Sequence, residues 1–114
     1  MKPLIVGEAP ARTGDPMKPL EGPCGIKLAA IFGITYDEYL ETFSRLNVLP
    51  GWPGKDGKGD QFPMAQARER ARQIVIEGRT TFLLGKRVAQ AFGFRPQARF
   101  LSEYFSPAGK WRIM

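Results

Sequence analysis

The chain of 114 residues contains no histidine and a single cysteine, Cys24. The absence of histidine excludes Cys–His and Ser–His–Asp catalytic groups within the chain. One cysteine excludes an internal disulfide and any four-cysteine zinc or iron–sulfur site, and it is typical of a reducing compartment. We therefore expect a cytoplasmic protein with no metal and no cofactor.

Long apolar runs and phosphate-binding loops are also missing. The longest apolar runs are far shorter than a membrane-spanning helix, and no secretory signal is visible, so we expect no membrane partner. Neither a Gly-x-x-x-x-Gly-Lys-Ser/Thr loop nor a Gly-x-Gly-x-x-Gly loop follows any predicted strand. This argues against a small nucleotide-binding α/β protein, which we keep as the weakest of three hypotheses.

The charge balance points to an anionic partner. The formal net charge is +6 and the sequence isoelectric point is about 9.8. A basic domain of this kind favours nucleic acid, although charge alone does not separate DNA from RNA or from a phosphorylated small molecule.

Hydrophobic periodicity predicts four strands alternating with helices. The strands are expected at Leu4–Val6, Arg45–Leu49, Thr80–Leu84 and Lys110–Met114. The helices are expected at Ile26–Phe32, Tyr36–Phe43, Met64–Glu77 and Lys86–Phe92, with one further helical turn over Leu101–Phe105. This order predicts a single α/β domain over residues 1–114, a three-layer α/β/α sandwich with a short, mostly parallel four-stranded sheet.

Side-chain spacing assigns a core face to each helix. The first helix offers Ile26, Ala29, Ala30 and Phe32, and the third offers Ala67, Ala71, Ile74 and Val75 opposite a mainly basic outer face. Thr35 and Glu38 form a capping-box pattern at the start of the second helix.

The first strand opens into a polar loop that holds the leading candidate site. The apolar run Leu4–Val6 ends in Gly7, Glu8, Ala9 and Pro10, and a second acid, Asp15, follows. Open α/β sheets bind ligands beyond the carboxyl ends of their strands. A carboxylate there can orient water or stabilise a developing cation, so Glu8 and Asp15 are the candidate catalytic groups. The alternative is a solvated loop acid.

Asn47 lies inside the second predicted strand, beside the first if the connections are short. Its amide carries both a donor and an acceptor and can read the edge of a base. The alternative is a buried amide that backbone groups satisfy.

Two further segments can contact a phosphate backbone. The glycine-rich loop Gly54–Gly59 carries Lys55 and Lys58, although a solvated surface loop is an equally good interpretation. Gly85, Lys86 and Arg87 follow the third strand at the start of a helix, where free amides attract anions unless the glycine serves only a tight turn.

Taken in order, these segments resemble the uracil-DNA glycosylase superfamily, in the branch whose first motif reads Gly-Glu-Ala-Pro-Gly. Gly7–Ala11 is similar to that motif, Gly22–Leu28 to the following helix start, Asn47–Pro53 to the asparagine strand and its Pro-rich loop, and Leu84–Ala89 to a Leu-Gly-x-x-Ala segment. The match extends over nearly the whole chain.

The resemblance implies excision of a uracil-type base that is flipped out of single- or double-stranded DNA. It implies that Glu8, or alternatively Asp15, positions water or stabilises the sugar cation. It implies that Asn47 binds the base, together with Gly7, Ala9 and Pro10 of the first motif. The same resemblance implies a four-stranded parallel sheet between helices.

The chain departs from the family pattern in three places. The family's C-terminal His-Pro-Ser-type loop is missing, the iron–sulfur cysteines are reduced to Cys24, and Cys24 and Gly25 stand where an aromatic residue stacks on uracil. Phe32 or Trp52 is then a candidate substitute. Without a final helix we expect a partly bare sheet face that favours self-association. A C-terminally truncated domain, or a catalytically inactive DNA- or partner-binding module of the same fold, is the alternative function.

Overall fold

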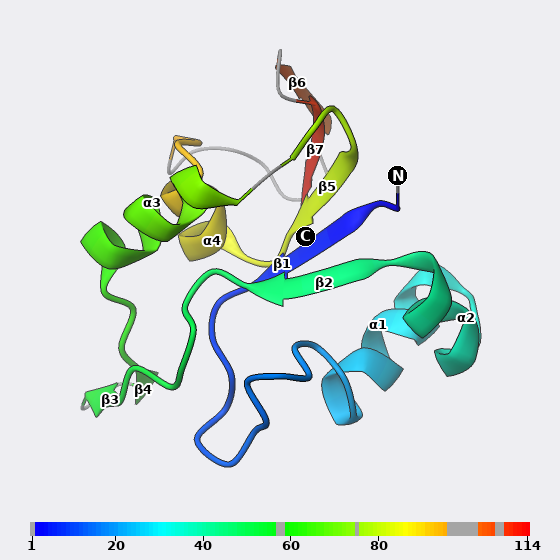
Figure 1. Cartoon of the computed structure of the whole chain (residues 1–114), viewed down its shortest axis with the longest axis horizontal. Coiled ribbons are helices and arrows are strands. Elements are labelled where there is room, and N and C mark those ends of the chain that lie inside the picture. The colour runs from blue at the N-terminus through cyan, green and yellow to red at the C-terminus, as the bar shows by residue number, and fades with distance from the viewer. Residues whose placement is uncertain (1, 57–58, 75, 96–102, 107–108) are drawn as a thin grey trace.

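A computed structural model describes residues 2–56, 59–74, 76–95, 103–106 and 109–114 (Figure 1). The strands are β1 (Leu4–Gly7), β2 (Ser44–Asn47), β3 (Lys55–Asp56), β4 (Gly59–Asp60), β5 (Thr80–Leu83), β6 (Glu103–Ser106) and β7 (Gly109–Ile113). The helices are α1 (Pro23–Phe32), α2 (Tyr36–Thr42), α3 (Met64–Gln73) and α4 (Lys86–Ala91). Within the described ranges, no helix has the length and apolar character needed to span a membrane.

The main sheet has the strand order β2-β1-β5-β7-β6. Its first four strands are parallel, which confirms the predicted parallel sheet, and β6 pairs antiparallel with β7 at the edge. The chain leaves β1 for β2 on one side and later crosses to β5 on the other, so the topological switch point lies between β1 and β5. Ligand sites in open α/β sheets form beyond the carboxyl ends of strands at this point.

Helices cover both faces of the sheet, as the three-layer prediction requires. Ile5 of β1 packs in a cluster with residues of α1 and α2, whereas its neighbours Leu4 and Val6 pack with residues of α3 and α4. Successive side chains of a strand point to opposite faces, so the two clusters lie on opposite sides of the sheet. Figure 1 shows the α1–α2 pair and the α3–α4 pair well separated, with the sheet between them.

Helix α1 begins three residues earlier than predicted, with Pro23 in its first turn. Its core face is therefore different. Ile26 and Ala30 are exposed, contrary to the prediction, and the buried positions are Gly25, Leu28 and Ala29. Gly25 shifts the buried face because a Cβ there would lie 2.6 Å from the Leu20 carbonyl oxygen.

Helix α3 ends at Gln73, four residues before its predicted end. Ala67 and Ala71 are buried as predicted, and Arg68, Glu69, Arg70 and Arg72 form the exposed face. Ile74 adopts an extended backbone with φ −77° and ψ 124°. Ile76 lies in the core, which a continuing helix with Ala67 and Ala71 on its buried face would prevent. Val75 lies outside the described residues.

The predicted helical turn over Leu101–Phe105 is wrong where the structure describes it. Glu103–Ser106 forms β6, whose partner is β7, so the sheet has five strands instead of four. Pairing with a neighbouring strand decides this segment, and pairing leaves little trace in local composition. β7 places Trp111 and Ile113 in the α3–α4 core, and Lys110 and Arg112 alternate with them toward the other face. Self-association through a bare sheet face stays a prediction.

Candidate functional site

A cavity of about 520 Å³ lies beyond the carboxyl ends of β1 and β2. The loop between β1 and α1 supplies most of its lining, Pro23 and Cys24 of α1 border it, and Asn47 contributes from the end of β2. We call it the Asn47 cavity. Its volume falls in the range of small-molecule sites, which begins at about 300 Å³.

Asn47 lies opposite Gly7 in the parallel register of β1 and β2. The Oδ1 atom of Asn47 is buried and has no hydrogen-bond partner among the described residues. A Cβ on Gly7 would lie 2.6 Å from this oxygen and 2.8 Å from Cδ2 of Leu20. Glycine at position 7 is therefore what lets the amide and the Leu20 side chain approach β1. The structure confirms that Asn47 neighbours the first strand.

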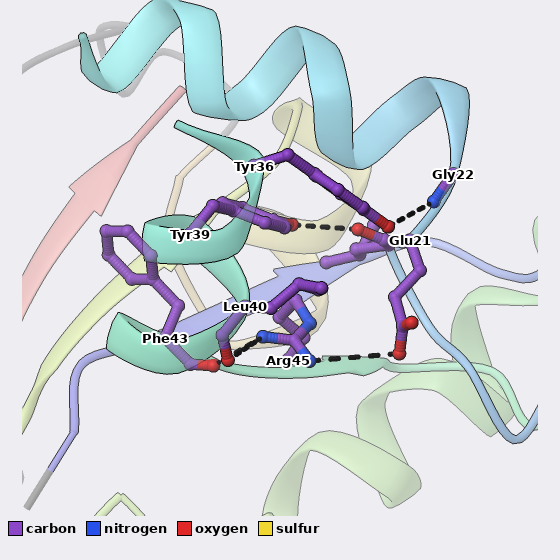
Figure 2. Close-up of polar contacts among 8 residues, drawn as sticks. Glu21, Gly22, Tyr36, Tyr39, Leu40, Phe43 and Arg45 are labelled. Carbon is purple, nitrogen blue, oxygen red and sulfur yellow. Dashed lines mark hydrogen bonds and ion pairs between the residues drawn. The ribbon is translucent and has the colours of Figure 1, made fainter. Parts of the chain in front are cut away.

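Two tyrosines of α2 form hydrogen bonds to the Leu20–Gly22 segment, which forms one wall of the Asn47 cavity. The hydroxyl of Tyr39 donates to the Leu20 carbonyl at 2.8 Å, and the Gly22 N–H donates to the hydroxyl of Tyr36 at 2.8 Å (Figure 2). Leu20 has a positive φ of 58°, a conformation that is unfavourable for a branched side chain. These two hydrogen bonds fix the segment in that conformation.

Arg45 of β2 also contacts the segment that forms this wall. Its Nη1 donates to the carbonyls of Leu40 and Phe43, its Nη2 lies 3.8 Å from Glu21 Oε2, and its guanidinium lies 5.4 Å from the Tyr39 ring centroid. Figure 2 shows the Arg45 guanidinium between the Glu21 carboxylate and the backbone carbonyls beside it at the end of α2. Burial raises the pKa of Tyr39 to about 12, and the nearby Arg45 charge offsets part of that effect.

Glu8 is directed toward α4, and it does not line the Asn47 cavity. Its Oε1 lies 2.6 Å from Arg87 Nη2, and its Oε2 accepts from Arg87 Nε at 3.3 Å. Arg87 also lies over the Phe62 ring, 5.2 Å from its centroid. The pair therefore bridges the carboxyl ends of β1 and β5 at the switch point, with both side chains partly exposed.

Asp15, the second candidate acid, does line the Asn47 cavity. Its Oδ1 accepts a hydrogen bond of 2.8 Å from the Met17 N–H, which leaves Oδ2 for other contacts. Cys24 lines the same cavity and is an exposed residue. Partial desolvation raises the pKa of the Cys24 thiol, and the nearby Lys27 charge opposes that shift.

The structure brings together only part of the predicted site. Ala9 and Pro10 line the Asn47 cavity with Asn47 and Asp15, while Gly7 lies against Asn47 and does not itself line the cavity. Glu8, Gly85, Lys86 and Arg87 gather instead at the junction of β1, β5 and α4. Glu8 Oε2 lies 3.7 Å from where a Cβ on Gly85 would stand.

The predicted phosphate contacts are altered by the fold. Helix α4 has only six residues, and the Gly85 N–H already donates to the Met114 carbonyl at 2.7 Å, so its first turn is a poor anion site. Lys55 is exposed on the short β3–β4 hairpin, and Lys58 lies outside the described residues.

Neither aromatic residue proposed as a stacking substitute reaches the Asn47 cavity. Phe32 packs in the core against Phe43 and Phe82, with ring centroids 4.6 and 5.2 Å away. Trp52 lies beneath the guanidinium of Arg12 outside the cavity.

Sequence patterns did not identify the wall residues Leu20, Glu21, Tyr36, Tyr39 and Arg45. The helical spacing of Tyr36 and Tyr39 favours core packing and gives no sign of a site, and Tyr39 is indeed fully buried. The signal that was available is chemical, since a tyrosine hydroxyl in a core requires a polar partner. Within the described ranges, no three acidic or cysteine side chains cluster closely enough to hold a metal ion.

No protein-family model, curated protein or solved structure matches this chain at a significant level.

Proposed function

We propose that the chain binds a uracil-type base of DNA in the Asn47 cavity and hydrolyses the N-glycosidic bond of that nucleotide. The observation that carries the proposal is the buried, unpartnered Oδ1 of Asn47, a residue that lines a ligand-sized cavity. A buried acceptor without a partner costs about 1–3 kcal/mol, and a bound N–H donor would recover that cost. The imide N–H of uracil is such a donor.

The carboxylates support a hydrolytic step. Asp15 lines the cavity and retains one oxygen that the Met17 N–H does not occupy. Glu8 has two oxygens engaged by Arg87 and remains partly exposed. Asp15 is therefore the better candidate for positioning water or stabilising the sugar cation, and Glu8 is the second candidate.

The charge of +6 supports a nucleic-acid partner, since phosphate contacts supply most non-specific affinity. The exposed basic face of α3 and the exposed Lys55 and Lys86 add cations for that purpose.

A second candidate function is a DNA-binding module without catalysis. The Glu8–Arg87 pair favours it, because a carboxylate held by an arginine has fewer lone pairs for water. The absence of histidine favours it too, since general-acid help to a leaving group contributes about 10²–10⁴-fold in rate.

The first test is incubation with single-stranded and duplex oligonucleotides that carry one deoxyuridine, followed by alkaline cleavage. Asp15→Asn and Glu8→Gln identify the acid that acts, with Asp37→Asn as an exposed control on α2. Cleavage that Asp15→Asn abolishes supports hydrolysis at the Asn47 cavity. Salt-dependent binding without cleavage supports the non-catalytic module. If the protein neither cleaves nor binds these oligonucleotides, both functions are overturned.

A second test measures whether a base occupies the Asn47 cavity, and it does not depend on catalysis. Cys24 is the only thiol and lines the cavity, so a bound base should slow its alkylation by a maleimide. We expect a uracil-containing oligonucleotide to protect Cys24 more than its thymine counterpart does. Asn47→Ala should remove the difference, and Gln73→Ala, an exposed amide at the end of α3, should not.

A further inference from the structure

Arg12 connects the loop that follows β1 with the loop that follows β2. Its neighbours Ala11 and Thr13 line the Asn47 cavity, while its guanidinium lies 5.8 Å from the centroid of the Trp52 ring. Trp52 itself lines a second, smaller hollow of about 270 Å³, which we call the Trp52 hollow. A single cation therefore lies between two concave sites at the same edge of the sheet.

The Trp52 hollow has the chemistry of a nucleobase site. Trp52 is 36% exposed and offers an indole surface, and Gln66 at the start of α3 offers an exposed amide. Pro50 and Pro53 add rigid apolar walls. Aromatic rings stack on any base, and an amide can hydrogen-bond a base edge.

The surrounding charge suits a polyanion. In a second arginine–aromatic pair, Arg87 of α4 lies over Phe62, which belongs to the same connection between β2 and α3 as Trp52. Both pairs place a cation against a ring near the carboxyl ends of the strands, and the chain carries a net charge of +6. Aromatic platforms interleaved with cations are the usual means of binding single-stranded nucleic acid.

We infer that the Trp52 hollow binds an undamaged base of a single-stranded nucleic acid, with the Arg12 guanidinium on the phosphate that leads toward the Asn47 cavity. A base in a duplex is stacked on its neighbours and paired, so it is not available to the indole. Only the link to the Asn47 cavity rests on the proposed function. The hollow itself binds strands that contain no uracil.

The test uses the fluorescence of the full chain during titration with a short oligothymidylate at low salt. The protein has two tryptophans, and Trp111 is buried against Phe92 and Phe94. We expect the oligonucleotide to quench Trp52 and leave Trp111 unchanged, so Trp52→Phe should abolish the quenching. Trp52→Ala should weaken binding by about 5- to 150-fold, the range expected for the loss of one stacked base.

Arg12→Gln should weaken binding and lower its salt dependence by about one phosphate contact, since each contact contributes to the slope. Lys2→Gln is the charge-matched control, because it removes an exposed cation that precedes β1, at the opposite edge of the sheet. Gln66→Ala, on a helix surface, tests the hollow independently if Trp52→Ala is poorly folded by circular dichroism. A modest loss is expected for Gln66→Ala.

Three results would overturn the inference: no quenching by oligothymidylate, unchanged affinity of both Trp52→Ala and Gln66→Ala, or tighter binding of a duplex than of the single strand. The proposed function fails separately. In that case Cys24 is not protected by uracil and no base is released, while oligothymidylate still quenches Trp52.

Discussion

Gly7 and Asn47 face each other across the β1–β2 pair so closely that a Cβ on Gly7 would lie 2.6 Å from Asn47 Oδ1. The amide oxygen occupies the space that any other residue at position 7 would fill. The first residue of the Gly-Glu-Ala-Pro motif and the asparagine of the next parallel strand are thus in direct contact beside the cavity that Asn47 lines.

Gly7→Ala should therefore displace the Asn47 amide. We expect a loss of stability of about 1–3 kcal/mol from overpacking and loss of the uracil-specific protection of Cys24. Denaturant unfolding and maleimide labelling measure the two effects. Gly51→Ala is the control, because a Cβ there meets no atom within 4 Å. Unchanged protection in Gly7→Ala would argue that the amide is not the base-reading group.

Asn47→Ala should separate function from stability. Because Oδ1 has no partner among the described residues, its removal costs no hydrogen bond at that atom. We expect the free energy of unfolding to stay within about 1 kcal/mol of the parent or to rise, whereas a satisfied structural amide would cost about 1–3 kcal/mol. Urea unfolding of the unliganded protein decides between a ligand-binding amide and a structural one. A large loss would assign Asn47 to the core instead of to a ligand.

The Glu8–Arg87 pair should contribute little to stability. Both side chains are partly exposed, at 34% and 45%, so solvent screens the attraction. A double-mutant cycle of Glu8→Gln and Arg87→Gln should give a coupling of about 0.5 kcal/mol that shrinks at high salt. The measurement is urea unfolding at two salt concentrations. A coupling of zero in low salt would mean that the pair does not persist in solution.

Tyr39 should make the fold sensitive to alkali. Its pKa is raised to about 12 in the folded protein because the ring is buried, and its ordinary value is 10.0. The folded state holds this proton more tightly than the unfolded state. The contribution of the protonated Tyr39 hydroxyl to the free energy of unfolding is therefore complete below pH 10 and is lost as the pH rises toward 12. We expect a fall of roughly 2–3 kcal/mol across that window. Tyr39→Phe should remove this component, and an equal alkaline slope in the variant would contradict the assignment.

The contribution of the α2 capping box to stability should be measurable at acid pH. Thr35 Oγ1 accepts from the Glu38 N–H at 3.1 Å, and the Thr35 N–H donates to Glu38 Oε1 at 3.1 Å. The hydrogen bond from the Thr35 backbone is the main cause that holds the pKa of Glu38 below its usual value. The stabilisation that ionised Glu38 gives the folded state is complete above the usual pKa of a glutamate, and it is lost as the pH falls below the lowered pKa of Glu38. Thr35→Ala should cost about 1 kcal/mol and raise the pKa of Glu38, followed by NMR titration, only part of the way toward normal, because the backbone N–H at position 35 remains as a donor.

The sequence determined the elements whose signals are local. Leu4–Val6 was recognisable as a central strand because both of its faces are apolar, and the structure buries it between two helical layers. The Thr35–Glu38 box fixed the start of α2, since capping depends on residues three positions apart. Short connections then placed Asn47 beside β1.

Tertiary structure decided what depends on partners distant in the sequence. β6 exists because Glu103–Ser106 pairs with β7, and α3 stops early because the core takes up Ile76. Glu8 and Asp15, seven positions apart in one loop, separate because Arg87 holds the first while the second lines the Asn47 cavity. The sequence identified the residue types of the candidate site, but long-range contacts selected which of them share a cavity.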